Sequence, residues 1–169
     1  MDRRVMDDPA KLGQKTCYIF RGPPGSGKTT VAKRFAKVFT PSIYICMDDY
    51  RMVDGIYKFD PSKVQDDVKR MKDEFYTAIN TGDDIILDNV HSREWEYAWA
   101  IRAAEMHNYV VHVLEVQADI LECSRRQRHP VPFDKLVGIF KRWETPVRLP
   151  VTEDLLLMLS KIIDKLGVV

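Results

Sequence analysis

Four short apolar runs, each with little alternation between apolar and polar positions, recur along most of the chain. They are rich in Ile, Val, Leu or Tyr and cover Thr16–Phe20, Ile43–Met47, Asp84–Asp88 and Tyr109–Val116. Continuous apolar runs of this length are typical of strands that are covered on both faces, as in a parallel sheet. The pattern therefore predicts four buried parallel strands.

Helical periodicity fills the segments between these runs, over Lys28–Phe39, Pro61–Asn80 and Arg93–His107. In the second segment, Met71 and Phe75 belong to one apolar stripe at helical spacing. Strands that alternate with helices imply right-handed crossovers and a doubly wound α/β sheet. We expect the strand order 2-3-1-4, with helices on both faces of the sheet.

Beyond the fourth apolar run the pattern is helical. The expected helices cover Ala118–Arg125, Pro132–Trp143 and Thr152–Leu166. A chain of 169 residues is most simply one domain with a core of its own. We therefore expect a flexible tail over residues 1–14 and a single domain over residues 15–169.

The stretch "GPPGSGKT", Gly22 to Thr29, matches the phosphate-loop pattern G-x-x-x-x-G-K-[ST] in full. It lies between an expected strand and an expected helix, which is the context that this motif requires. Glycines let backbone N–H groups turn inward around a phosphate, and the helix N-terminus adds partial positive charge. The alternative, a Gly/Pro turn with a solvated lysine, fits this context poorly. We expect a bound nucleoside triphosphate, and the lack of an N-K-x-D guanine signature favours ATP.

The residue types of this loop suit phosphate and metal binding. Lys28 would place a point charge on the β- and γ-phosphates, and Thr29 would offer its hydroxyl to Mg²⁺. At the end of the third apolar run, Asp88 has the Walker B form and is expected to orient Mg²⁺, directly or through water. The expected nucleotide-binding residues are Gly22, Pro23, Pro24, Gly25, Ser26, Gly27, Lys28, Thr29 and Thr30.

Charge and cysteine content bear on partners and compartment. The formal net charge is +1, so any site for a polyanion has to be a local patch. No apolar run approaches the length that crosses a membrane. The three cysteines, Cys17, Cys46 and Cys123, are few and widely spaced, which favours small core residues in a reducing, intracellular compartment.

The second apolar run ends in "MDDYR", Met47 to Arg51. The carboxyl end of a parallel strand faces the ligand crevice, where an aspartate can accept a proton from an attacking hydroxyl group. Arg51, three residues after Asp48, can bind a phosphate group. In isolation, a solvated turn or a helix N-cap is the simpler explanation of Asp48 and Asp49. After the second strand of a phosphate-loop protein, a kinase base becomes the favoured role for at least one of them.

Basic residues cluster in "CSRRQRHPVP", which includes Arg125, Arg126 and Arg128. A solvated basic loop is the plain explanation. A small phosphoryl-transfer enzyme, however, needs a group that covers the γ-phosphate and neutralises its developing charge, and an arginine supplied in cis does this. We therefore expect a helical lid with Arg128 or Arg126 as its catalytic arginine.

The motifs "GPPGSGKTT", "MDDYR", "DGIYKFDP", "IILDNVHSREWE" and "RRQRHPVP", in this order, resemble those of the polynucleotide-kinase-like P-loop proteins. The segment from Asp48 to Trp143 is most similar to the kinase-like domains of NEDD4-binding protein 2 and its relatives. The segment "KRWETPVRLP" is also similar to the C-terminal P-loop domain of the YLP-motif-containing nuclear protein. The resemblance spans roughly Cys17 to Pro150, and its motifs are specific in combination and weak singly.

The resemblance implies a P-loop kinase fold and roles for particular residues. Asp48 would activate an incoming 5′-hydroxyl, and Arg51 would hold the acceptor phosphate. Arg128 matches the lid arginine, with Arg126 at the base or the sugar. Relatives carry D-T-N or D-N-T-N where this chain has "DNVH", so a contact to the acceptor is either lost or remade by His91. By itself, His91 is typical of a helix start or a surface position.

Together these features predict an ATP- and Mg²⁺-dependent phosphotransferase, with RNA or DNA carrying a free 5′-OH as the favoured acceptor. Two alternatives stay open: a nucleoside or sugar kinase of the same fold, and an ATP-binding interaction module without transfer activity. The altered "DNVH" favours the module, whereas Lys28, Thr29, Asp48, Arg51 and Asp88 argue against it. We expect an intracellular protein without a membrane partner, and the resemblance to the YLP-motif protein slightly favours the nucleus.

Overall fold

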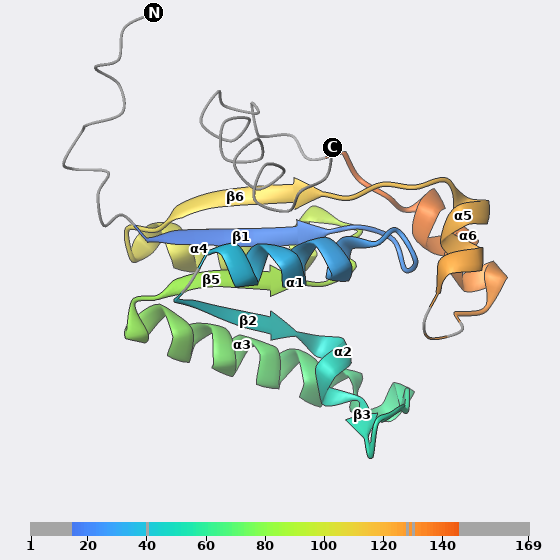
Figure 1. The fold of residues 1–169 in the computed structure, drawn as a ribbon, viewed down its shortest axis with the longest axis horizontal. Helices are drawn as coiled ribbons and strands as arrows, with labels where there is room; N and C mark the ends of the chain where they lie inside the picture. Colours follow the sequence, from blue (N-terminus) through green and yellow to red (C-terminus); the bar gives the residue numbers. More distant parts are fainter. Residues whose placement is uncertain (1–14, 40, 128, 130, 146–169) are drawn as a thin grey trace, which may run out of the picture.

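The computed structural model describes residues 15–39, 41–127, 129 and 131–145. Their centre is a parallel sheet of the strands β1 (Thr16–Arg21), β2 (Ser42–Cys46), β5 (Asp84–Asp88) and β6 (Val110–Glu115). The strands lie in the order β2-β5-β1-β6, which is the predicted order 2-3-1-4 (Figure 1). The predicted α/β fold and its strand order are therefore confirmed.

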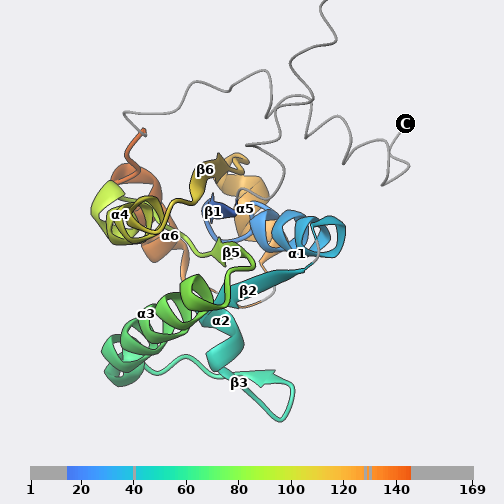
Figure 2. The ribbon, with the colours of Figure 1, turned by 90° about the vertical axis from the view of Figure 1, so that its left-hand side faces the viewer.

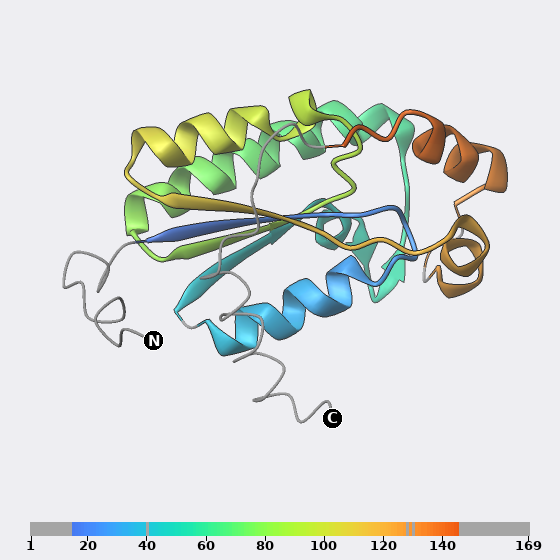
Figure 3. The same ribbon diagram turned by 90° about the horizontal axis from the view of Figure 1, so that it is seen from above.

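Six α-helices are described, and they surround this sheet on both faces and at one end. They are α1 (Lys28–Val38), α2 (Met47–Tyr50), α3 (Val64–Thr81), α4 (Ala98–Met106), α5 (Ile120–Arg126) and α6 (Phe133–Lys141). Helix α1 covers one face of the sheet, whereas α3 and α4 cover the other (Figure 2). Helices α5 and α6 lie beyond the carboxyl ends of the strands (Figure 3).

Burial of both faces of the sheet explains the continuous apolar runs. In β1, Cys17 and Ile19 pack into the cluster that contains α3 and α4 residues. The alternate residues Tyr18 and Phe20 pack with Phe35 of α1. Successive side chains of a strand point to opposite faces, so a strand buried on both sides needs apolar residues at every position.

A short hairpin between α2 and α3 was not predicted. Its strands are β3 (Met52–Val53) and β4 (Ile56–Tyr57). The backbone φ angles of Asp54 and Gly55 are 53° and 77°, which are typical of the two central residues of a type I′ turn. The Asp-Gly pair therefore turns the chain back, so that Tyr57 pairs with Met52 at the same end of the sheet as α2 (Figure 1).

Arg21, the last residue of β1, is a fully buried cation that ties three segments together. Its Nη1 lies 3.4 Å from Glu115 Oε2, at the end of β6. Its Nη2 donates hydrogen bonds to the carbonyl oxygens of Ser92 at 3.3 Å and Glu144 at 2.7 Å. The guanidinium also lies 4.5 Å from the Trp143 ring. This cluster fastens the segment after α6 to the strand that leads into the phosphate loop.

Other predictions divide between confirmed and untested. All three cysteines are free and buried, as expected for small core residues. The predicted tail over residues 1–14 and the predicted helix Thr152–Leu166 lie outside the described residues. In the described part of the chain, no helix is long and apolar enough to cross a membrane.

Replacing Arg21 by Met should lower the free energy of unfolding by about 3–5 kcal/mol, because Glu115 and two backbone carbonyls would lose a buried partner. Urea unfolding measures this loss. Lys63→Met is the control, because both partners of its ion pair with Asp60 are exposed, and little or no change in the free energy of unfolding is expected there. Similar small losses in both variants would show that Arg21 does not fasten these segments.

Candidate functional site

The phosphate loop runs from the end of β1 to the start of α1 and folds against α5. Within it, the Ser26 backbone N–H donates to the Pro23 carbonyl at 3.1 Å. A Cβ atom at Gly25 would lie 2.0 Å from the Cys123 carbonyl oxygen, and the Gly25 φ angle is 83°. Only glycine satisfies both the contact and the left-handed backbone there. Gly25 of the phosphate-loop motif is therefore required by the local packing and backbone conformation, as well as by phosphate binding.

Lys28 and Asp88 form a buried ion pair beside this loop. Lys28 Nζ lies 3.8 Å from Asp88 Oδ1, and the two side chains are 9% and 0% exposed. The Tyr44 hydroxyl of β2 donates to Asp88 Oδ2 at 2.7 Å. Burial, together with the Asp88 charge, raises the pKa of Tyr44, so this hydroxyl keeps its proton. One carboxylate oxygen is thus fixed by Tyr44, while the other faces Lys28.

The polar atoms around the loop fit a triphosphate with a hydrated cation. Ser26 Oγ and Asp88 Oδ1 are buried and have no hydrogen-bond partner among the described residues. Gly27 precedes α1 without a capping side chain, which leaves the first N–H groups of the helix for an anion. In the described part of the chain, no group of three or more His, Cys, Asp and Glu forms a metal cage. Mg²⁺ held mainly by phosphates, with Thr29 and a water-bridged Asp88, fits this donor set.

Asp48 and Arg51 come together at the end of β2, where the short helix α2 carries both aspartates of the "DD" pair. Asp48 Oδ1 lies 3.5 Å from Arg51 Nη1. Arg51 Nε donates to Asp67 Oδ2 at 2.9 Å. Asp49 points elsewhere and lies 3.5 Å from Lys33 Nζ. The structure therefore distinguishes the two aspartates, and Asp48 is the one that faces the arginine.

The carboxylates of Asp48 and Asp88 lie at the same edge of the sheet. Cys46 ends β2 and is the register partner of Asp88 in β5. Burial raises the pKa of the Cys46 thiol to about 11, and the charges of both Asp88 and Asp48 add to the rise. The ATP side and the acceptor side of the predicted site are thus on neighbouring strand ends, as the motif order implies.

The predicted lid is present as α5 and α6, but its arginines are only partly described. Helix α5 touches the phosphate loop through Cys123 and Gly25. Arg126, at the end of α5, is exposed and donates to Glu122 Oε1 at 2.6 Å. Arg128 lies outside the described residues. In this arrangement Arg126 is exposed and paired with Glu122, and binding a phosphate would require it to leave Glu122.

His91 is buried, so the predicted surface position is wrong. It is 3% exposed, and its Nδ1 lies 3.2 Å from the Phe20 carbonyl oxygen. Burial, together with the smaller effects of the Lys28 and Arg21 charges, lowers the pKa of His91 to about 3. Among the described residues it makes no hydrogen bond with the acceptor-side pair. His91 therefore lies buried against β1, and its position does not suit a replacement contact to the acceptor.

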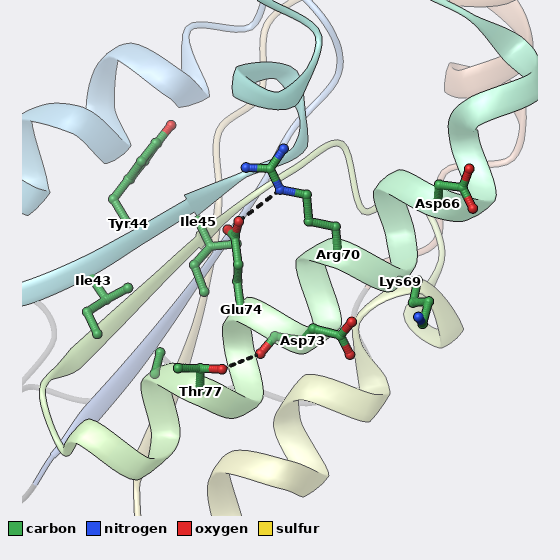
Figure 4. A pocket seen from close by; sticks show the side chains of 10 residues that line it. Ile43, Tyr44, Ile45, Asp66, Lys69, Arg70, Asp73, Glu74 and Thr77 are labelled. Atoms are coloured by element: carbon green, nitrogen blue, oxygen red, sulfur yellow. Dashed lines mark hydrogen bonds and ion pairs between the residues drawn. The ribbon is translucent and has the colours of Figure 1, made fainter.

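A hollow of about 580 Å³ lies between the edge strand β2 and α3 (Figure 4). It is lined by Ile43, Tyr44, Ile45, Asp66, Lys69, Arg70, Asp73, Glu74, Thr77 and Ala78. Arg70 Nε bonds to Glu74 Oε1 at 3.1 Å within it. The lining contains no residue of the phosphate loop and neither Asp48 nor Arg51, and it shares Tyr44 with the candidate site, so the hollow borders the site without containing its phosphate-binding or acceptor-side groups.

Three residues of the site were not predicted from the sequence: Tyr44, Tyr57 and Asp67. Tyr44 lies on the α1 face of β2, two residues before Cys46. The alternation of side chains along this strand could have predicted that position from the sequence. The Asp-Gly turn likewise brings Tyr57 back beside Met52. Asp67 lies in the first turn of α3, where an acidic residue is ordinary, so nothing distinguished it.

The chain matches known proteins along the segment that carries the site. The profile of a family described as "AAA domain" matches residues 18–129. NEDD4-binding protein 2 from Homo sapiens is 26% identical over 164 residues, a match that covers 88% of this chain and 9% of that protein. The predicted resemblance to this protein is therefore confirmed, although the chain spans less than a tenth of its length.

Two solved structures have a similar fold. A chain of the Pnkp1/Rnl/Hen1 complex has a TM-score of 0.58 and 19% identity, and the match covers 69% of this chain and 40% of that one. A gluconokinase from Sinorhizobium meliloti 1021 has a TM-score of 0.55 and 14% identity, covering 88% and 92% of the two chains. At these identities the likeness establishes the fold.

Tyr44→Phe should weaken ATP binding in the presence of Mg²⁺ about tenfold or more, because Asp88 loses the hydroxyl group that orients it. Binding in EDTA should change much less. Isothermal titration in the two buffers measures both affinities, with Tyr76→Phe on the exposed side of α3 as the control. Equal losses in Mg²⁺ and in EDTA would show that Tyr44 does not act through a metal-side carboxylate.

His91→Asn should make the free energy of unfolding less sensitive to acid. The folded-state pKa of about 3 lies below the ordinary value of 6.5, so His91 stabilises the fold fully above pH 6.5 and progressively less as the pH falls toward 3. Asn does not titrate, accepts the positive φ of 46°, and can donate to the Phe20 carbonyl. Urea unfolding between pH 6.5 and about 4.5 should give a flatter profile than the parent. An unchanged profile would contradict the buried, neutral imidazole, and His107→Asn is the exposed control.

Proposed function

This chain belongs to the AAA domain family, and from that membership we propose that it is an ATP- and Mg²⁺-dependent phosphotransferase. The favoured acceptor is a polynucleotide with a free 5′-hydroxyl. The observation that carries the proposal is the pair of carboxylates, Asp48 and Asp88, at neighbouring strand ends beside an intact phosphate loop. We further propose that residues 15–169 form one kinase-like domain.

The phosphate loop and α1 would hold ATP through backbone N–H groups and Lys28. Lys28 would exchange its contact with Asp88 for the β- and γ-phosphates, a move that its position at the start of α1 allows. Thr29 would contribute its hydroxyl to the metal, and Asp88 Oδ1 would hold a metal-bound water. When bound, Mg²⁺ would neutralise the charge that develops on the transferred group.

Asp48 would act as the general base. Its carboxylate would take the proton of the acceptor hydroxyl as that oxygen forms a bond to the γ-phosphorus. The bond from the γ-phosphorus to the bridging oxygen breaks, and ADP leaves with the electron pair. Asp48 is 42% exposed, so a hydroxyl group can approach it from solvent.

Arg51 and the lid arginines would bind negative charge on either side of the transferred group. Arg51 keeps its guanidinium fixed through Asp67 and would hold a phosphate of the acceptor. Arg126 or Arg128 would neutralise charge on the γ-phosphate once the lid closes. For Arg126, closure would replace the exposed contact with Glu122, which is a weak competitor in water.

A small-molecule acceptor is the second candidate, because the acceptor side already carries a surplus of negative charge. Arg51 is a single cation that contacts two carboxylates, those of Asp48 and Asp67. Such a cluster attracts a phosphodiester less strongly than an unpaired arginine would. A neutral nucleoside or sugar hydroxyl fits the same base, and the fold similarity to a gluconokinase agrees with this alternative.

Asp48→Asn should bind ATP·Mg²⁺ like the parent and transfer phosphate to a 5′-OH oligonucleotide at least about 10²-fold more slowly, because it lacks the proton acceptor. Asp49→Asn is the matched control, since Asp49 pairs with Lys33 away from Arg51. Rates are measured with labelled ATP and RNA, DNA and nucleoside acceptors in parallel. Transfer confined to nucleosides or sugars would select the second candidate. If Asp48→Asn transferred phosphate as fast as Asp49→Asn, Asp48 would not be the general base.

A further inference from the structure

The hydroxyl group of Tyr57 lies between the two acceptor-side residues. Arg51 Nη1 donates to the Tyr57 oxygen at 3.1 Å, and the Tyr57 hydroxyl donates to Asp48 Oδ1 at 3.2 Å. The direct contact between Arg51 Nη1 and Asp48 Oδ1 is longer, at 3.5 Å. The two hydrogen bonds made by the Tyr57 hydroxyl are therefore shorter than the direct contact between Arg51 and Asp48.

Tyr57 is itself held from three sides. The hairpin pairs it with Met52, and the Lys58 N–H donates to the Arg51 carbonyl at 2.8 Å. Its ring stacks on the His129 ring with centroids 3.8 Å apart and an interplanar angle of 13°. Burial raises the pKa of Tyr57, so the hydroxyl stays a donor at neutral pH.

Both hydrogen bonds at Asp48 end on the same oxygen. Oδ1 accepts from Tyr57 and Arg51, whereas Oδ2 accepts no hydrogen bond from any described residue. Fixing one oxygen holds the plane of the carboxylate and directs the other oxygen to solvent. A general base needs such an arrangement, because its free oxygen has to meet the acceptor proton within hydrogen-bond distance.

We propose that Tyr57 is a positioning residue that orients Asp48 and Arg51, and that His129 seats its ring from the segment between α5 and α6. This inference rests on the proposed function. It assigns to the hairpin a part in catalysis that the phosphate-loop and "DDYR" motifs do not contain. It also links the acceptor side to the lid, since loss of the ring stack would loosen the residue that holds the base.

The kinetic test compares Tyr57→Phe with Tyr76→Phe, which removes a hydroxyl from an exposed position on α3. Tyr57→Phe should lower kcat about tenfold or more and leave KM for ATP unchanged, because the carboxylate of the base loses its orientation while the ATP side is untouched. A kcat within about twofold of the control would overturn the proposal.

The His129 contact has its own matched pair. His129→Phe keeps a planar ring for the stack, whereas His129→Ala removes it. The Ala variant should approach the kcat of Tyr57→Phe, and the Phe variant should stay near the parent. If His129→Ala kept the kcat of the parent, the His129 ring would not be needed to hold Tyr57, and this part of the proposal would be wrong.

A measurement that needs no activity keeps this inference separate from the proposed function. Protein labelled with ¹³C at the tyrosine Cζ atoms gives a Tyr57 resonance, assigned by its loss in Tyr57→Phe. That resonance should move in Asp48→Asn and stay in Asp49→Asn, because only Asp48 accepts the Tyr57 hydrogen bond. An unmoved resonance in Asp48→Asn would overturn the contact. A moved resonance in a protein without kinase activity would uphold the contact and refute the proposed function.

Discussion

The buried contact between Lys28 and Asp88 is the interaction on which the ATP side of the site depends. It joins the first residue of α1 to the last residue of β5, so it fixes how the helix leaves the sheet. A buried carboxylate is costly unless it is paired and hydrogen-bonded, and here Tyr44 supplies the hydrogen bond and Lys28 the charge. When ATP binds, its phosphates would replace Asp88 as the partner of Lys28, and the metal would replace Lys28 as the partner of Asp88.

The acceptor side is built differently, from short elements rather than from the sheet. The four-residue helix α2 carries Asp48 and the two-residue strand β4 carries Tyr57, while Arg51 lies between α2 and the two-residue strand β3. Such elements have little core of their own, and the hydrogen bonds among their polar side chains hold them in place. The ATP side is therefore anchored by the sheet through Asp88 at the end of β5, whereas the acceptor side depends on a small polar network and on the ring stack with His129.

Sequence patterns predicted the sheet well because its central strands β1 and β5 are buried on both faces and its helices show clear periodicity. The phosphate loop, Asp48 and Asp88 followed from their places at strand ends. Contacts between segments distant in sequence were harder to predict. Tyr44 donates a hydrogen bond to Asp88, which is 44 residues away, and Arg21 donates one to the Glu144 carbonyl, which is 123 residues away. His91 was misjudged because a polar residue after a strand is usually exposed, whereas here the imidazole is buried against the Phe20 carbonyl of β1.

Transfer of label from γ-³²P-labelled ATP by the unmodified protein tests the central claim most directly. The site predicts that label appears on a 5′-OH RNA or DNA oligonucleotide, that EDTA abolishes the transfer, and that a 5′-phosphorylated oligonucleotide accepts none. Mg²⁺-dependent ATP binding without transfer to any RNA, DNA, nucleoside or sugar would contradict it. The carboxylates at the two strand ends would then serve an ATP-binding module instead of a kinase.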